Sequence, residues 1–234
     1  EVVGTISEGM IDKLEAKGIN KNKIYYLPNW IDPKKFKQKN EQKRLFNIYR
    51  EKFNLSPETI VIQYSGTMNK KQGFDFLIPI IENFKNHKNV FWIFGGEGPT
   101  KKQLIYSTRK IKNIKFLPFQ DSDKMSDWLN FGDIHIIPQD EKVEDLLFPS
   151  KLLAILASGN PIISNCSPNS DLGKIISDVG LRIDPKDQVK FIEAINFLIE
   201  NPDKRYLLGK KARIFVEKKF NQRFVLEKFN KFLK

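Results

Sequence analysis

From about Thr59 onward, short apolar runs rich in β-branched and aromatic residues alternate with stretches long enough to form helices. The predicted strands are 60–64, 90–94, 114–117, 134–137, 161–163 and 181–183, and the predicted intervening helices include 74–84, 99–110, 123–129 and 150–157. Strands that are apolar on both faces and alternate with helices are typical of a parallel sheet covered on both sides. The pattern therefore predicts an α/β, Rossmann-like, doubly wound parallel sheet.

The two ends of the chain depart from this alternation. Residues 1–7 predict the end of a strand that leads into a helix capped by Ser7, since serine is a preferred N-cap residue. Residues 202–234 predict two consecutive helices with no strand between them. The second helix carries an apolar stripe at helical spacing, formed by Phe224, Val225, Phe229 and Phe232. We expect an extra helical tail that packs and can reach another domain.

The net charge of +12 first suggests a nucleic-acid partner. However, only seven of the 40 basic residues are arginine, whose planar fork is preferred for reading bases and phosphates. The lysines are also scattered over many predicted helices. A solvated, lysine-rich surface is therefore favoured and no nucleic-acid partner is expected, although a positive face could rest against anionic membrane lipids or anionic substrates.

Cysteine and histidine are scarce, which narrows the possible chemistry. The single cysteine, Cys166, cannot form an internal disulfide and is expected in the core, which suits a reducing cytosol. No secretion leader opens the chain, so a cytoplasmic location is expected, with peripheral contact at the inner face of the membrane as a further possibility. His87 and His135 are the only histidines, and no cluster has metal-ligand spacing. We expect His135 in the core and no bound metal.

Ligands of doubly wound sheets bind beyond the carboxyl ends of the strands, where helix N-termini attract anions. Three segments there could hold phosphate: 65–73 with Gly66 and Lys71, 95–99 with Gly96, Gly98 and Pro99, and 148–151 at a helix start. Lysine in a first helical turn costs a few tenths to about 1 kcal/mol. A bound diphosphate would explain Lys71 and Lys151. The glycines lack the third position of a dinucleotide fingerprint, which argues against an NAD-dependent dehydrogenase.

Taken in order, these segments resemble the C-terminal half of family 4 glycosyltransferases, the sucrose-synthase-like GT-B enzymes. The similar segments are Thr5–Glu8, Lys23–Asp32 with Phe36, Tyr64–Gly73, Phe94–Pro99 with Leu104, Asp133–Pro138, Pro149–Leu153 and Ala157–Ile163. Trp30 and the Pro-Ser-Lys sequence at 149–151 look most like bacterial members that build capsule, O-antigen or colanic-acid-type polysaccharide.

The resemblance implies two Rossmann-like domains, with the nucleotide-sugar donor bound mainly by the second and the acceptor mainly by the first. On that basis, residues 1–27 are expected to be a remnant of the acceptor domain and the inter-domain crossing. Residues 28–201 are expected to form the donor domain, and the helices of 202–234 to return toward the missing first domain. The resemblance also implies transfer with retention of anomeric configuration, and no metal or other cofactor.

The sequence departs from the family pattern at several positions. Most members have two glutamates separated by seven residues around the donor helix, and these positions are Leu146 and Ala154 here. The basic residue expected before Gly73 is Gln72, and the arginine often found after Gly66 is Thr67. These changes remove the usual side-chain contacts to ribose and pyrophosphate, so the expected donor contacts are mainly those of the backbone.

The resulting hypothesis is a retaining transferase that uses a nucleotide-diphosphate sugar, with UDP expected, in bacterial surface polysaccharide synthesis. The acceptor is a glycan or a lipid-linked sugar reached through the missing domain. The predicted donor-binding residues are Gly66, Lys71, Gly96, Glu97, Gly98, Phe119, Gln120, Pro149, Ser150, Lys151 and Leu152. We assign no catalytic residue.

Three alternatives remain at this point. A UDP-sugar 2-epimerase has the same architecture and would be expected to place acidic and histidine residues at the cleft. A non-catalytic domain would retain nucleotide-sugar binding for scaffolding and would explain the missing glutamates. A basic nucleic-acid-binding module would shift random duplex DNA in a salt-dependent manner.

Overall fold

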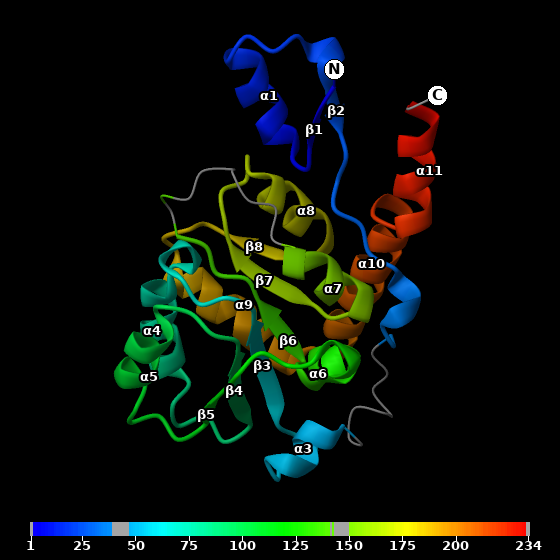
Figure 1. Cartoon of the computed structure of the whole chain (residues 1–234). Helices are drawn as coiled ribbons and strands as arrows, with labels where there is room; N and C mark the ends of the chain where they lie inside the picture. The colour runs from blue at the N-terminus through cyan, green and yellow to red at the C-terminus, as the bar shows by residue number, and fades with distance from the viewer. Residues whose placement is uncertain (1, 39–46, 141, 143–149, 233–234) are drawn as a thin grey trace.

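The computed structural model describes residues 2–38, 47–140, 142 and 150–232. Its main sheet is entirely parallel and has the strand order β5-β4-β3-β6-β7-β8. These strands are β3 (Ile60–Ser65), β4 (Val90–Gly95), β5 (Ile114–Leu117), β6 (Ile134–Ile136), β7 (Ile162–Asn165) and β8 (Leu181–Ile183). The predicted α/β class and parallel sheet are confirmed, and Figure 1 shows the sheet between two layers of helices.

Helices cover both faces of the sheet, as a doubly wound fold requires. One face is covered by α4 (Phe74–Asn83), α5 (Lys101–Ser107) and α9 (Gln188–Glu200). The other is covered by α3 (Ile48–Lys52), α6 (Met125–Phe131), α7 (Ser150–Ser158), α8 (Asp171–Val179) and α10 (Pro202–Lys219). Cys166 and His135 are buried, as predicted, and His135 Nε2 lies 2.9 Å from the carbonyl oxygen of Leu129.

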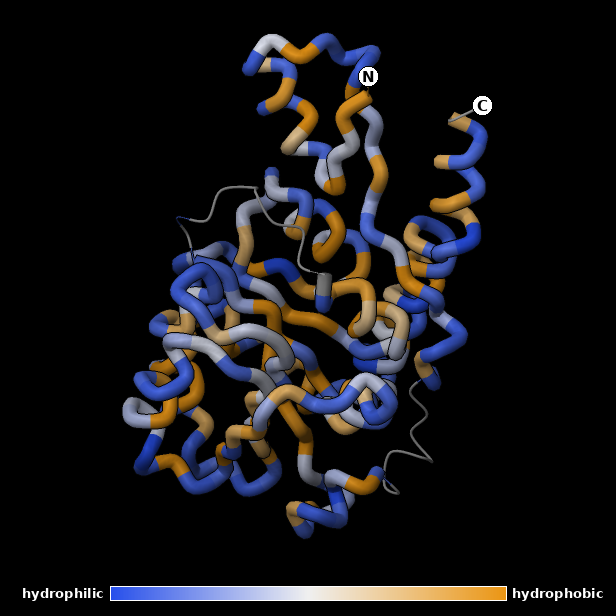
Figure 2. Tube along the Cα trace, viewed as in Figure 1, coloured by the Kyte–Doolittle hydropathy of each residue, from blue (hydrophilic) through white to orange (hydrophobic). Residues whose placement is uncertain are grey.

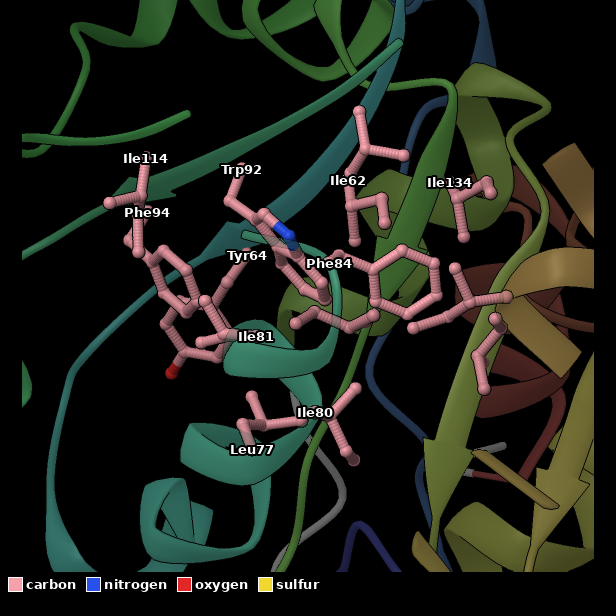
Figure 3. Packing of buried hydrophobic residues seen from close by; sticks show 14 of the residues in the cluster. Ile62, Tyr64, Leu77, Ile80, Ile81, Phe84, Trp92, Phe94, Ile114 and Ile134 are labelled. Carbon is pink, nitrogen blue, oxygen red and sulfur yellow. The ribbon is translucent and has the colours of Figure 1, made fainter. Parts of the chain in front are cut away.

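The core under α4 is rich in aromatic side chains. Figure 3 shows Tyr64 and Trp92, from neighbouring strands, directed toward Leu77 and Ile81 on α4. All four side chains are completely buried, and each burial of this kind stabilises the fold by about 1.5–3 kcal/mol. Figure 2 shows the same organisation along the chain, with hydrophobic strands inside and hydrophilic segments on the outer helices and loops.

The first residues form a small unit of their own, at one end of the molecule in Figure 1. Strands β1 (Val3–Thr5) and β2 (Ile24–Tyr26) pair in parallel, and α1 (Glu8–Ala16) lies between them in sequence. Ser7 caps α1 as predicted, because its hydroxyl accepts a hydrogen bond from the backbone N–H of Met10 at 3.3 Å. Short 3₁₀ helices occur at Lys21–Lys23, Pro33–Lys35, Lys70–Gln72 and Ser122–Lys124.

The helical tail binds the segment that joins the small unit to the main sheet. Helices α10 and α11 (Gln222–Phe232) follow each other with no intervening strand, as predicted. The Ile31 N–H donates to the carbonyl of Phe220, and the Gln222 N–H donates to the carbonyl of Ile31. On the apolar stripe of α11, the ring of Phe232 stacks on Tyr25 with centroids 4.1 Å apart. The tail therefore fixes residues 25–31 beside it.

Several predicted boundaries are shifted. The helix expected at 123–129 is observed as α6, Met125–Phe131. The helix expected at 99–110 is shorter at both ends, Lys101–Ser107, and Pro99 lies in the preceding turn. The backbone N–H of Thr100 donates to the carbonyl of Met68 at 3.2 Å, so the neighbouring loop holds the turn before the helix can start. In the described residues, no helix is long and apolar enough to span a bilayer.

Candidate functional site

The order of the strands reverses between β3 and β6. From β3 the chain moves outward through β4 and β5, and from β6 it moves outward in the other direction through β7 and β8. In open parallel sheets, ligands bind in the crevice beyond the carboxyl ends at such a point. Gly66 follows β3 directly, and α7 is the next described helix after β6. Two of the predicted phosphate-binding segments therefore flank this point.

Lys151, in the first turn of α7, extends across Gly66. A Cβ atom placed on Gly66 would lie 3.1 Å from Lys151 Cδ and 3.5 Å from its Nζ. The ammonium ends over the Tyr64 ring, 4.0 Å from the ring centroid. The structure thus brings together Lys151 and Gly66, which are far apart in sequence. It adds Tyr64, which was predicted as the end of a strand and as part of a family-like segment but not as a donor-site residue.

The surroundings of Lys151 disfavour its positive charge. Burial lowers the pKa of Lys151 from 10.5 to about 7. Within the described part of the chain, no carboxylate forms an ion pair with its ammonium, and the helix N-terminus adds a positive partial charge. The aromatic face of Tyr64 supplies only partial compensation. An anion bound here would restore the charged form of Lys151.

The glycines after β4 are required by contact between two loops. A Cβ atom on Gly96 would lie 1.9 Å from the carbonyl oxygen of Gly66, and one on Gly98 would lie 2.1 Å from that of Met68. Both glycines also have positive φ angles, of 145° and 151°. The Met68 N–H donates to the carbonyl of Glu97 at 2.8 Å. This loop packing requires the glycines, whether or not a donor approaches their backbone.

Lys71 lies in a short 3₁₀ helix beside the site. Asn69 caps this helix through the Lys71 N–H at 3.0 Å, and Gln72 completes the capping box, so Gln72 has a local structural role. The Lys71 carbonyl accepts a hydrogen bond from the backbone N–H of Asp140, which anchors the turn to the chain after β6. The Lys71 side chain itself is exposed and forms no ion pair with the described residues.

Glu97, Phe119 and Gln120 follow the ends of β4 and β5. The Glu97 carboxylate is engaged, because Lys101 Nζ lies 2.6 Å from it. Gln120 Oε1 accepts a hydrogen bond from the Tyr49 hydroxyl at 2.8 Å. The Phe119 ring is 55% exposed, which makes it the predicted residue most open to stacking with a planar ligand.

The remaining predicted residues belong to α7 or precede it. The Leu152 side chain is completely buried in the core, so only its backbone N–H could face a ligand. Pro149, the Ser150 side chain and Leu146 lie outside the described part of the structure. Ala154 is half-buried on α7.

A hydrogen-bond network under the first loop was not predicted from the sequence. Trp128 Nε1 donates to Ser65 Oγ at 2.8 Å, and Gln63 Nε2 donates to the same oxygen at 3.0 Å. A Cβ atom on Gly95 would lie 2.3 Å from the Trp128 ring, so this glycine makes room for the tryptophan. The adjacent glycines Gly95 and Gly96 are a sequence signal of close packing at the end of β4. The identity of the contacting residue, Trp128, depends on tertiary structure and could not be predicted.

No three His, Cys, Asp or Glu side chains among the described residues are arranged to hold a metal ion. The groups that lie together at the carboxyl edge of the sheet are the Lys151 ammonium, the glycine-containing loops after β3 and β4, and the first turn of α7.

The sequence is similar to a known protein family and to two curated proteins. The sequence profile described as "Glycosyl transferases group 1" matches residues 46–215. The chain is 26% identical over 234 residues to WcaI of Escherichia coli K12, whose name describes a colanic acid biosynthesis glycosyl transferase, covering 97% of this chain and 55% of that protein. It is 23% identical over 239 residues to WbjE of Pseudomonas aeruginosa, whose name describes a glycosyltransferase, covering 97% of this chain and 56% of that protein.

The fold is similar to that of a solved structure with a bound nucleotide. Anabaena HepE, in complex with UDP, has a TM-score of 0.83 at 14% identity, covering 99% of this chain and 63% of that one. The similarity supports the predicted architecture, the C-terminal half of a GT-B fold with a helical tail. The chain spans about half the length of the curated relatives it matches.

Proposed function

The chain belongs to the group 1 glycosyl transferases, and from that premise we propose that it binds a nucleotide-diphosphate sugar for transfer to an acceptor. The observation that carries the proposal is Lys151, held across Gly66 at the switch point of the sheet. A diphosphate is the ligand class that best matches a partly buried ammonium at the start of a helix. UDP is the proposed nucleotide, following the family resemblance and the UDP-bound state of HepE.

In this proposal, Lys151 stabilises the negative charge of the leaving diphosphate. Cleavage of the bond between the sugar and the diphosphate leaves an additional negative charge on the diphosphate. A positioned ammonium in a partly desolvated site stabilises charge that develops in the transition state. The backbone N–H groups in the first turn of α7 would share that role. Lys71 is exposed and would add a smaller contribution from the neighbouring turn.

The names of the relatives support a proposal about the biological setting. We propose a role in bacterial surface polysaccharide synthesis, in keeping with the colanic acid assignment in the name of WcaI. The proposed reaction retains anomeric configuration, and the acceptor is a glycan or a lipid-linked sugar. A cytoplasmic location and contact with the inner face of the membrane remain predictions. The family match favours transfer over epimerisation.

A thermal-shift panel with UDP, UMP, uridine, GDP and ADP tests donor binding. UDP is expected to raise the melting temperature, while uridine should have little effect because it lacks the diphosphate. Lys151→Ala should remove most of the rise. Lys85→Ala is the control. Lys85 is a half-exposed lysine that follows α4 and pairs with Glu82, and it is not among the predicted donor-binding residues. The proposal fails if no nucleoside diphosphate raises the melting temperature of the unmodified chain.

A further inference from the structure

A cavity separate from the Lys151 site lies between the small N-terminal unit, α8 and the helical tail. Its volume is about 360 Å³, within the range of small-molecule sites. Its lining comes from α1, from residues 25–28, from α8 and from both tail helices. Figure 1 shows the N-terminal unit, α8 and α11 toward the same end of the molecule.

This cavity lies on the edge of the sheet where the donor site lies. Asp171 is the first residue of α8, the helix that follows β7. Lys151 is in the first turn of α7, which precedes β7 and follows its neighbour β6. Because the carboxyl ends of parallel strands share one edge, Asp171 and Lys151 lie on that same edge. A ligand in the cavity would approach the donor from the side of β7.

The polar groups of the cavity can both donate and accept hydrogen bonds. The Tyr26 hydroxyl has no hydrogen-bond partner among the described residues. Burial, together with the carboxylates of Glu8 and Asp171, raises the pKa of Tyr26 to about 12, so its hydroxyl remains protonated at neutral pH. The two carboxylates are acceptors. Such a combination suits hydroxyl groups, which donate and accept at once.

Apolar and cationic groups complete the lining. Phe224 is 42% exposed, and with Leu27 and Phe215 it offers apolar surface of the kind that packs against the C–H face of a sugar ring. Lys228 Nζ lies 4.4 Å from the centroid of the Phe224 ring, and Lys174 Nζ lies 3.9 Å from Asp171. The mixture of lysines with carboxylates disfavours a polyanion, because a phosphate would meet like charges on one side.

We propose that this cavity binds a saccharide unit of the acceptor glycan. The inference rests on the proposed function, since a transferase must hold an acceptor beside its donor. The acceptor would then contact this chain as well as any further domain. Tyr26, Glu8 and Asp171 would bind the sugar hydroxyls, and Phe224 would pack against the ring.

Saturation-transfer NMR on the 234-residue chain tests the proposal, with maltose, cellobiose and lactose at millimolar concentration as probes. At least one disaccharide should receive saturation from the protein. Tyr26→Phe and Asp171→Asn should each weaken that binding by roughly 2- to 12-fold, the equivalent of one hydrogen bond. Tyr106→Phe is the matched control, because Tyr106 is 66% exposed and lies outside the cavity.

The inference would be overturned if no disaccharide received saturation, or if the Tyr26→Phe and Asp171→Asn variants transferred as much saturation as the unmodified chain. It would also be overturned if the cavity bound inorganic pyrophosphate but no disaccharide, and if that binding depended on Lys219 and Lys228. The UDP-induced thermal shift is measured on the same preparations. A chain that responds to UDP and binds no saccharide overturns this inference alone. A chain that binds saccharide and does not respond to UDP overturns the donor assignment and leaves the saccharide site standing.

Discussion

The ammonium of Lys151 lies 4.0 Å from the centroid of the Tyr64 ring, which joins the start of α7 to the end of β3. A cation over an aromatic face is stabilised by about 0.5–2 kcal/mol, depending on its solvation. This is less than the cost of burying the charge, because the pKa of Lys151 falls to about 7. Without a bound anion, Lys151 therefore destabilises the fold, a feature that is typical of functional groups.

Lys151→Met should stabilise the protein at neutral pH when no nucleotide is added. The pKa of Lys151 is lower in the folded state than its usual 10.5, so the unfolded chain binds more protons between about pH 7 and 10.5. The unfolding free energy of the unmodified chain should therefore rise across this window. The advantage of the Met variant, about 1–3 kcal/mol at pH 7, should shrink toward pH 10. Urea unfolding at several pH values measures this difference, and an advantage that stays constant with pH would argue against the charge penalty.

Gly98→Ala should disrupt the paired loops. The new Cβ atom would lie 2.1 Å from the Met68 carbonyl oxygen, and the positive φ of 151° is unfavourable for alanine. We expect a loss of at least about 2 kcal/mol in unfolding free energy and weaker UDP binding. Gly4→Ala is the control, because nothing lies within 4 Å of its added Cβ. Equal stability of the two variants would contradict the loop packing.

Arg50→Met should be strongly destabilising. Arg50 and Asp133 form a buried ion pair at 3.3 Å, and Arg50 also donates to the carbonyl of Thr59 at 2.7 Å. Removing the guanidinium leaves a buried carboxylate without its cation, which costs about 3–5 kcal/mol. Arg223→Met removes an exposed pair and should leave the melting temperature unchanged. Equal melting temperatures of the two variants would contradict a stabilising role for the Arg50–Asp133 pair.

UDP binding should not depend on a divalent metal ion. The resemblance to GT-B transferases implies that no metal is needed, and Lys151 supplies positive charge at the switch point. The UDP-induced thermal shift should therefore be the same with EDTA as without it. Loss of the shift in EDTA, with recovery on adding Mg²⁺, would show that a metal ion takes part in donor binding.

Much of the fold was predictable because its signal is local. The runs at 60–64 and 90–94 are apolar on both faces, and the observed strands extend each by a single residue. Such runs can be buried only inside a covered sheet. The start of α5 was not predictable, since it depends on a hydrogen bond from Thr100 to Met68 in a different loop.

The site was predicted in part, for a similar reason. Glycines and lysines at strand ends indicated where anions could bind, and Lys151 and Gly66 do meet. Their contact depends on β6 pairing with β3, which no local pattern encodes. The sequence also gave no indication that Gly96 would contact the Gly66 carbonyl, or that Trp128 would donate to Ser65. Such roles depend on residues distant in the chain.

Isothermal titration calorimetry with UDP at pH 7 and pH 9, on the unmodified chain and on Lys151→Met, tests the central claim most directly. The diphosphate should bind the protonated lysine, so the affinity of the unmodified chain should fall by up to about tenfold per pH unit above its pKa. The Met variant should bind at least about tenfold more weakly at pH 7 and show little dependence on pH. Equal affinities of the two proteins at pH 7, with the same pH profile, would contradict the assignment of Lys151 to the donor diphosphate.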